Sequence, residues 1–162
     1  MRSFVELKAE LDNNGLKSIP NISGYYLVWC PLNLSVQIRE KTDAVLTFSK
    51  DGKEKDLLYP KILLEKKMEL IEKIPDNNRY LFYIGKADRK SGGLRDRIIE
   101  FVRYGYGKCK THRGGRAIWQ IENNKDLLLE WIPCENSEAV EKKMLKEYKK
   151  KYTTYPLANW RS

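Results

Sequence analysis

Residues 22–29, ISGYYLVW, and residues 80–85, YLFYIG, decide the fold that this sequence predicts. Both stretches are rich in aromatic and β-branched residues, and Pro20 and Pro31 bound the first of them. Each stretch therefore predicts a short buried β-strand. Residues 127–132, LLLEWI, predict a third strand. The three strands are not adjacent in the sequence, so helices and loops must connect them.

Helical patterns lie around these strands. Ser3 can cap a first helix whose apolar side holds Phe4, Leu7 and Leu11 before Gly15 ends it. The same reasoning predicts a basic amphipathic helix over residues 94–104, a short helical turn over residues 117–121 and a last helix capped by Ser137.

Residues 31–79, between the first two strands, predict structure of their own. Asp51 and Gly52 stand between two extended segments, which is a strong signal for a β-hairpin. Pro60 suits the first turn of a helix that Pro75 ends. Together these elements predict an α+β fold, with a small central antiparallel sheet of about three strands flanked by helices and an inserted hairpin and helix.

The composition indicates one folded domain with a basic surface. A chain of 162 residues is close to the usual size of one domain, so we expect residues 1–162 to form one, with a helix and lead-in over residues 1–21. Lysine and arginine number 31 against 22 aspartate and glutamate, a net charge of +9. This charge favours nucleic acid as the partner, although lysine-rich surfaces also serve solubility alone.

Cysteine usage and hydropathy favour a cytoplasmic protein. Cys30, Cys109 and Cys134 are odd in number, lie far apart and lack metal-ligand spacing. They therefore indicate neither a disulfide framework nor a zinc site. No apolar run approaches the roughly 20 residues of a membrane span, and the first residues do not resemble a secretory leader. We expect reduced thiols, no membrane partner and a cytoplasmic location.

Two tyrosine motifs stand in the first two strands: GYY at residues 24–26 and YIG at residues 83–85. Neither tripeptide is informative alone, but four further features follow in a fixed order. They are Lys86 directly after the second motif, Arg97 in a Leu-x-x-Arg element, Glu141 ahead of an apolar pair, and Asn159 in the sequence PLAN.

In this order the motifs resemble those of the GIY-YIG nuclease family over roughly residues 22–161. The family usually joins its two tyrosine motifs by a short hairpin, so we interpret residues 31–79 as an insertion. Tyr25 stands where Ile or Val is usual, and we assign Tyr26 to the site. The resemblance implies a metal-dependent DNA endonuclease, which is a phosphodiester hydrolase, and a stand-alone chain is similar to restriction-type members.

The chemistry of phosphodiester hydrolysis suits these residue types. It needs a deprotonated water and neutralisation of charge on the phosphoryl oxygens. Glu141 is the expected ligand of one divalent ion, Mg²⁺ or else Mn²⁺, because one carboxylate with phosphate and waters can hold it. Arg97 would present a charged fork to the scissile phosphate. Tyr26 is the candidate general base, with Lys86 stabilising its phenolate.

Three further residues complete the expected site. Tyr83 would position water or phosphate, and Asn159 would hold the active-site loop by its amide. His112 would accept a proton or bind phosphate, since some restriction and homing members carry a functional histidine in a similar place. Taken singly, each site residue also has a plain interpretation as a core aromatic or a solvated helix residue. The order of the whole set favours the nuclease.

A basic region follows the second motif and predicts the surface that binds double-stranded DNA. Glycines at residues 92–93 and 114–115 permit close backbone approach to phosphates. A homodimer on palindromic DNA is one expected arrangement, because a two-fold protein matches a two-fold site. The predicted nucleic-acid-binding residues are Arg89, Lys90, Arg95, Arg103, Lys108, Lys110, Arg113 and Arg116.

Two other functions stay open on the sequence. One is a structure-specific repair or mobile-element nuclease of the same family, which would cut at a branch or nick and not at a sequence. The other is a DNA-binding module that has lost catalysis. The apparently complete set of tyrosine, arginine and glutamate argues against the second, because mere phosphate binding has no need of it.

Overall fold

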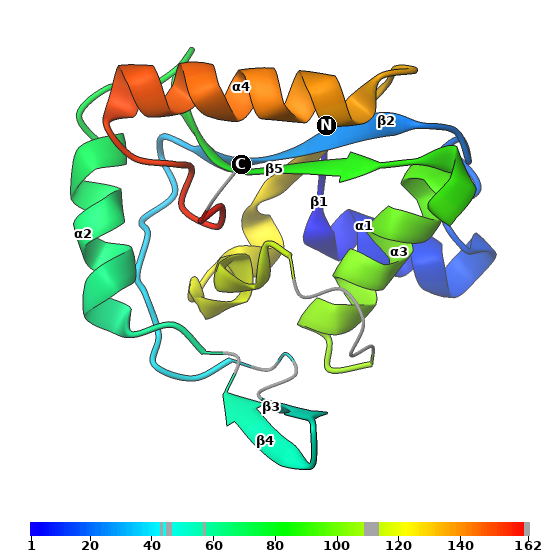
Figure 1. Ribbon diagram of the computed structural model, residues 1–162, viewed down its shortest axis with the longest axis horizontal. Coiled ribbons are helices and arrows are strands. Elements are labelled where there is room, and N and C mark those ends of the chain that lie inside the picture. The colour runs from blue at the N-terminus through cyan, green and yellow to red at the C-terminus, as the bar shows by residue number, and fades with distance from the viewer. Residues whose placement is uncertain (43, 45–46, 57, 109–113, 161–162) are drawn as a thin grey trace.

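A four-stranded antiparallel sheet in the order β1-β6-β2-β5 forms the centre of the computed structural model, which describes residues 1–42, 44, 47–56, 58–108 and 114–160 (Figure 1). β2 (Gly24–Pro31) lies between β5 (Arg79–Ala87) and β6 (Leu128–Pro133). The two-residue β1 (Arg2–Ser3) pairs with the other side of β6. The predicted α+β fold with a small central antiparallel sheet is confirmed, with β1 as an additional strand.

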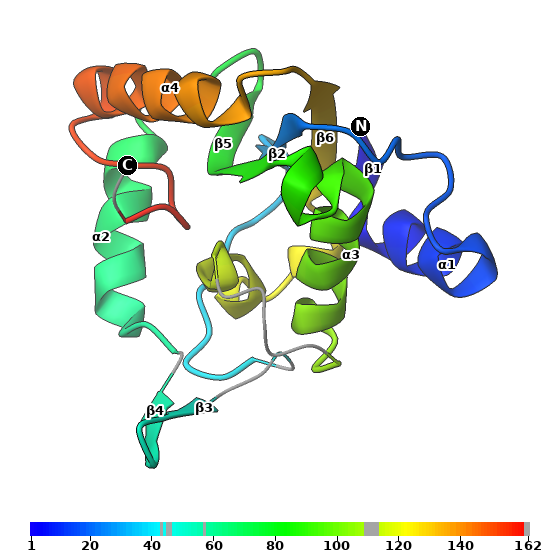
Figure 2. The same cartoon turned by 45° about the vertical axis from the view of Figure 1, so that its right-hand side comes forward.

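Helices cover both faces of this sheet. α4 (Ser137–Tyr152) lies along one face, and α3 (Gly93–Gly105) with α1 (Phe4–Asn14) lies on the other side (Figures 1 and 2). Because side chains alternate along a strand, neighbouring residues of β2 and β5 belong to different layers. This alternation decides which residues meet at the candidate site.

The ends of two helices test the predicted caps. In α1 the Ser3 hydroxyl accepts a hydrogen bond from the Glu6 backbone N–H at 3.2 Å, and the helix ends at Gly15 with φ 73°, as the sequence predicts. The predicted cap at Ser137 is wrong, because Ser137 is already the first residue of α4. Its buried hydroxyl donates instead to the Ala87 carbonyl oxygen at 3.1 Å and ties α4 to the end of β5.

Residues 31–79 form a hairpin and a helix beside the sheet. β3 (Thr47–Lys50) and β4 (Lys53–Asp56) project from the body of the molecule (Figures 1 and 2). α2 (Lys61–Ile71) and α3 lie on opposite sides of the molecule. Asp51 and Gly52 join the two strands with φ values of 53° and 71°, as the tight hairpin turn requires. The predicted hairpin and helix are both present.

In the part of the chain that the structure describes there are also three short 3-10 helices: η1 (Arg89–Ser91), η2 (Arg116–Gln120) and η3 (Asn124–Asp126). The buried Gln120 amide holds the 31–79 segment against η2, because it accepts from the Tyr59 N–H and donates to the Tyr59 carbonyl, both at 2.9 Å. Within the described ranges, no helix combines the length and the apolar character needed to cross a membrane.

Candidate active site

Tyr26 of β2 and Tyr83 of β5 form the centre of the candidate site. Their ring centroids lie 5.8 Å apart in an edge-to-face arrangement, and their side chains share a hydrogen bond. Both rings also pack on Phe101 of α3. Tyr26 is 0% exposed and Tyr83 is 6% exposed, so Tyr83 is the member of the pair that reaches the surface.

Two glycines make room for this pair. A Cβ atom at Gly85 would lie 2.4 Å from Cζ of Tyr26, and one at Gly115 would lie 2.8 Å from Cε1 of Tyr83. Carbon atoms that are not bonded to each other do not approach so closely, so a larger residue would displace either ring. The last residue of the YIG motif is therefore required by the tyrosine of the GYY motif, which pairs with it across β2 and β5.

Burial raises the pKa of both phenols. Loss of solvation is the largest cause, and it brings the pKa of Tyr83 to about 12 and that of Tyr26 well above its usual value of 10. The Arg97 guanidinium lowers both pKa values and the Glu141 carboxylate raises them. Both phenols are therefore within electrostatic reach of Arg97 and of Glu141. At neutral pH the two phenols carry their protons.

Lys86 does not lie where the sequence analysis expects it. It follows Gly85 in β5 and therefore points to the opposite, α4 side of the sheet, away from Tyr26. Its ammonium lies 3.8 Å from Oε2 of Glu141 and 3.3 Å from Oε1 of Glu138. The expected stabilisation of the Tyr26 phenolate by Lys86 is thus not supported, and the positive charge that lowers the pKa of Tyr26 is that of Arg97.

Glu141 occupies a largely buried position on α4, where its side chain is 18% exposed. Loss of solvation raises the pKa of its carboxyl, and Lys86 acts in the opposite direction. A largely buried carboxylate that has only one described cation, Lys86, within 4 Å can accept a further cation although Lys142 also acts on it, and oxygen donors suit Mg²⁺. No cluster of three or more metal-ligating side chains is present among the described residues, so any such ion would take its remaining ligands from phosphate and water.

A cleft of about 240 Å³ lies between the end of β5 and the first turns of α3 and α4. Lys86, Arg97 and Glu138 line it, together with Asp88 and Ser91. Arg97 also lies 3.0 Å from Oε2 of Glu100, one helical turn further along α3. Both partners are more than a third exposed, so the pair leaves the guanidinium accessible from solvent.

Asn159 supports the site through the backbone. Its Oδ1 accepts from the Ile84 N–H and its Nδ2 donates to the Ile84 carbonyl, both at 2.9 Å. Ile84 lies between Tyr83 and Gly85 on the edge strand β5, and the Ala158 N–H bonds the Phe82 carbonyl at 2.8 Å. The PLAN segment therefore holds β5 at the position that carries the second motif, close to the role expected for Asn159.

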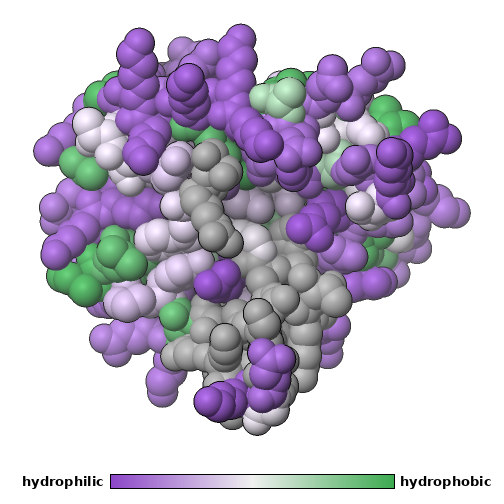
Figure 3. All heavy atoms as spheres, in the orientation of Figure 1, coloured by the Kyte–Doolittle hydropathy of each residue, from purple (hydrophilic) through white to green (hydrophobic). Residues whose placement is uncertain are grey.

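The predicted DNA-binding residues fall into three groups. Arg89, Lys90, Arg103 and Lys108 are exposed. Figure 3 shows that hydrophilic side chains cover much of one face of the molecule. Arg95 instead donates from Nε to the Ile19 carbonyl at 2.7 Å and anchors α3 to the loop after α1. Arg116 packs over the Tyr59 ring. Lys110, His112 and Arg113 lie outside the described residues.

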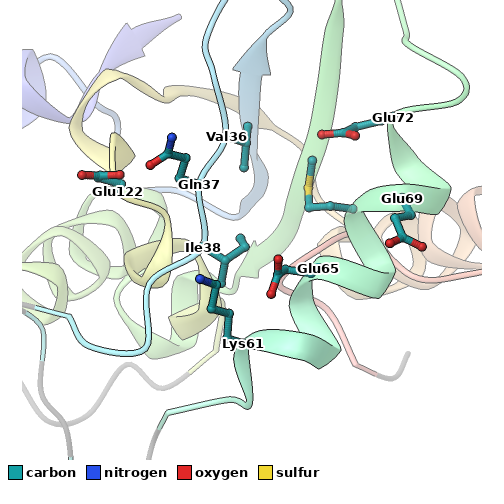
Figure 4. Close-up of a pocket in the computed structure, with 9 residues that line it drawn as sticks. Val36, Gln37, Ile38, Lys61, Glu65, Glu69, Glu72 and Glu122 are labelled. Atoms are coloured by element: carbon teal, nitrogen blue, oxygen red, sulfur yellow. The ribbon is translucent and has the colours of Figure 1, made fainter.

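A second groove, about 360 Å³ in volume, lies between α2 and the segment that holds Gln37 and Ile38 (Figure 4). The carboxylates of Glu65 and Glu122 stand on its two sides, and α2 adds Glu69 and Glu72. This acidic groove is unsuited to a phosphate backbone. A polyanion would therefore approach from the side of Arg97 and Lys86.

Two residues near the site are not among those that the sequence predicts. Glu138 pairs with Lys86. The sequence feature that could have identified Glu138 is its position one helical turn before Glu141. Tyr59 comes from the 31–79 segment and is close enough to Tyr83 to affect its pKa. Nothing in the local sequence marks Tyr59, because only the tertiary fold brings that segment to β5.

Comparison with protein families, curated proteins and solved structures gives no match to this chain.

Proposed function

We propose that this protein is a DNA endonuclease of the GIY-YIG type that hydrolyses phosphodiester bonds with the help of one divalent ion. The observation that carries the proposal is the hydrogen-bonded pair of Tyr26 and Tyr83 within electrostatic reach of both Arg97 and Glu141. These four residues come from four different elements. Packing alone would not require a cation and a carboxylate beside two buried phenols.

The chain's own residues divide the work of such a reaction. Arg97 would bind the scissile phosphate and offset the charge that develops there. Glu141 would hold the metal ion, which when bound lowers the pKa of water. Because the pKa of Tyr83 is about 12, its phenolate is rare at neutral pH. The neutral Tyr83 oxygen would instead accept a hydrogen bond from the attacking water, with Tyr26 fixing its orientation.

This division revises the role that the sequence suggests for Tyr26. A general base must be deprotonated when the water attacks, and Tyr26 is the more deeply buried phenol of the two. The pair is better suited to positioning water than to removing its proton. The restriction role, a homodimer on palindromic DNA and a cytoplasmic location belong to the same proposal.

A non-catalytic DNA-binding module is the second candidate. The ion pair between Lys86 and Glu141 favours it, because the lysine already supplies a positive charge where the metal ion would bind. The two candidates differ in whether DNA is cut when a divalent ion is present.

The test is incubation of the protein with plasmid and phage DNA in Mg²⁺, in Mn²⁺ and in EDTA, followed by sequencing of the ends. Cleavage with either ion and none in EDTA supports the nuclease. Discrete ends at one sequence would indicate restriction, whereas ends at branches or nicks would indicate a repair or mobile-element role. DNA binding without cleavage under every condition would favour the non-catalytic module.

A further inference from the structure

Four side chains from three distant parts of the chain form a continuous stack beside the candidate active site. The Arg116 guanidinium lies over the Tyr59 ring at 4.4 Å, and Tyr59 stacks on Trp160 with centroids 4.3 Å apart and planes 24° apart. The Lys67 ammonium lies over the Trp160 ring at 4.0 Å. Hereafter "the stack" means Arg116, Tyr59, Trp160 and Lys67, in this order.

The stack is anchored at its Lys67 end. Lys67 is buried on α2 and donates to the carbonyl oxygens of Pro156 at 2.8 Å and Asn159 at 2.6 Å. Asn159 in turn holds Ile84 of β5 through two hydrogen bonds. The Lys67 end of the stack is therefore joined, through Asn159, to β5, the strand that carries Tyr83.

Both faces of the Tyr59 ring are covered. Arg116 and Trp160 each lie within 4.5 Å of it, and two groups so close to one ring must occupy opposite faces. A nucleobase would have to displace one of them in order to stack on Tyr59. The ring is therefore suited to holding Arg116 in place rather than to binding a base.

Arg116 is also next to the candidate site. It directly follows Gly115, whose backbone is so close to Tyr83 that a Cβ atom there would lie 2.8 Å from the ring. The Tyr59 N–H and carbonyl are both bonded to Gln120 at the end of η2, so the backbone under Tyr59 is fixed as well. An arginine fixed beside the tyrosine pair can meet a phosphate near the scissile one.

We propose that Tyr59, supplied by the 31–79 segment, is a positioning residue that holds Arg116 as a phosphate-binding group beside Tyr83. This inference rests on the proposed function, since DNA is the ligand whose phosphate Arg116 would bind. It gives the 31–79 segment a part in substrate binding in addition to its own packing.

The test measures binding of a short fluorescein-labelled DNA duplex in EDTA, by anisotropy, over a series of salt concentrations. The slope of log Kd against log salt counts the phosphates that the protein neutralises, at about 0.9 for each contact. We expect Arg116→Gln to lower this slope by about one contact. We expect Tyr59→Leu to lower it by the same amount, although that change removes no charge, and Tyr59→Phe to leave it unchanged.

A double variant and a control complete the experiment. Tyr59→Leu combined with Arg116→Gln should lower the slope no further than Arg116→Gln alone. Tyr106→Leu is the matched control, because Tyr106 also lies beneath a lysine, with Lys8 of α1 at 5.1 Å from its ring centre, and should retain the full slope. Thermal denaturation of each variant identifies any that fails to fold.

The outcomes separate this inference from the function on which it rests. A full slope for Tyr59→Leu overturns the inference and leaves the nuclease proposal standing, as does a full slope for Arg116→Gln. If Tyr59→Leu does not fold, Arg116→Lys keeps the charge but loses the planar stack and must lower the slope for the inference to hold. Failure of the unsubstituted protein to bind the duplex overturns both proposals.

Discussion

The hydroxyl groups of Tyr26 and Tyr83 meet in a place where a phenolate is costly and a neutral hydrogen bond is favourable. Their mutual hydrogen bond fixes the direction in which the Tyr83 oxygen presents its remaining lone pair. Such orientation matters because a small misplacement of a reacting group can reduce a rate by about a hundredfold. The two residues should therefore act as one unit.

Tyr83→Phe should slow DNA cleavage by about a hundredfold, and Tyr26→Phe should have a similar effect, since each removes one half of the same hydrogen bond. The double variant should be no slower than either single one, as is usual for residues that act as a unit. Loss of one buried hydrogen bond costs about 1 kcal/mol, so the variants should stay folded. Single-turnover cleavage and thermal denaturation measure the two effects.

Tyr25→Phe is the control for this prediction. Tyr25 is adjacent to Tyr26 in β2 and therefore points away from the Tyr26–Tyr83 pair, so its hydroxyl takes no part in their hydrogen bond and its loss should not affect cleavage. Equal loss from Tyr25→Phe, with Tyr26→Phe still active, would assign the site to the other tyrosine of the GYY motif.

Glu141→Gln should separate DNA binding from cleavage. The change keeps the size of the side chain and removes the charge that would hold the metal ion. Binding without metal should be as tight or tighter, because a carboxylate that faces phosphate is repulsive until a cation lies between them. Cleavage should nearly vanish, and plasmid nicking with anisotropy measures both.

Glu147→Gln is a matched control on the same helix, since Glu147 is exposed and pairs only loosely with Lys143 at 4.0 Å. Cleavage by Glu147→Gln should equal that of the unsubstituted protein. An unaltered cleavage rate for Glu141→Gln would mean that Glu141 is an ordinary helix residue.

The residues that the sequence could place are those whose partners follow from a repeating geometry. Tyr26 and Gly85 belong to recognisable motifs, and their contact follows once β2 and β5 pair. That Lys86 points away from Tyr26 follows from the same alternation, whereas its pairing with Glu138 and Glu141 depends on which face of the sheet α4 covers, and a single sequence does not contain that information. Tyr59 meets Tyr83 only through the packing of the 31–79 segment.

At the scale of the elements, long periodic segments are predicted well and short ones are not. The residues of α1, α3 and the β3–β4 hairpin carry both a periodic pattern and an end signal, and all three form as predicted. β1 has two residues, too few for any pattern, and exists because it can pair with β6. The cap at Ser137 fails because its hydroxyl finds a buried partner on β5.

α2 carries a charged residue on its apolar side, and this has consequences for the element. Lys67 lies between Leu64 and Ile71 at helical spacing, so it is buried with them. Loss of solvation lowers the pKa of its ammonium to about 7. The position is occupied by lysine and not by an apolar residue because two carbonyl oxygens of the PLAN segment need donors there.

Lys67→Met should change how stability depends on pH. In the unfolded chain the lysine keeps its ordinary pKa of 10.5, whereas in the folded protein it is about 7. Between these values the unfolded state binds more protons, so the free energy of unfolding of the unsubstituted protein should rise with pH, by at most about 1.4 kcal/mol per unit. The methionine variant lacks this contribution.

The difference in stability between the two proteins should therefore grow in favour of lysine from about pH 7 towards pH 9. Below about pH 7 the lysine is protonated in both states, and the difference should level off. Urea denaturation at a series of pH values measures it. Parallel pH curves for the two proteins would mean that Lys67 keeps its ordinary pKa in the fold.

On the scale of the whole molecule, acidic side chains gather in the groove beside α2 (Figure 4). Exposed basic side chains come after β5, at Arg89 and Lys90, and on and after α3, at Arg103 and Lys108. In a chain of net charge +9, the surface with these basic side chains suits a polyanion better than the groove does. A surface of this kind attracts a polyanion to one side and orients it as it approaches.

DNA binding should consequently weaken steeply with salt. Six described basic residues outside the acidic groove could each meet a phosphate: Lys86, Arg89, Lys90, Arg103, Lys108 and Arg116. If each neutralises one phosphate, affinity should fall by about a thousandfold or more between roughly 50 and 200 mM salt, because every neutralised phosphate releases counterions. Glu65→Gln in the acidic groove should leave the slope unchanged, since DNA does not lie there. A flat response to salt would remove DNA as the partner, and with it the reason for placing an arginine and a carboxylate beside the tyrosine pair.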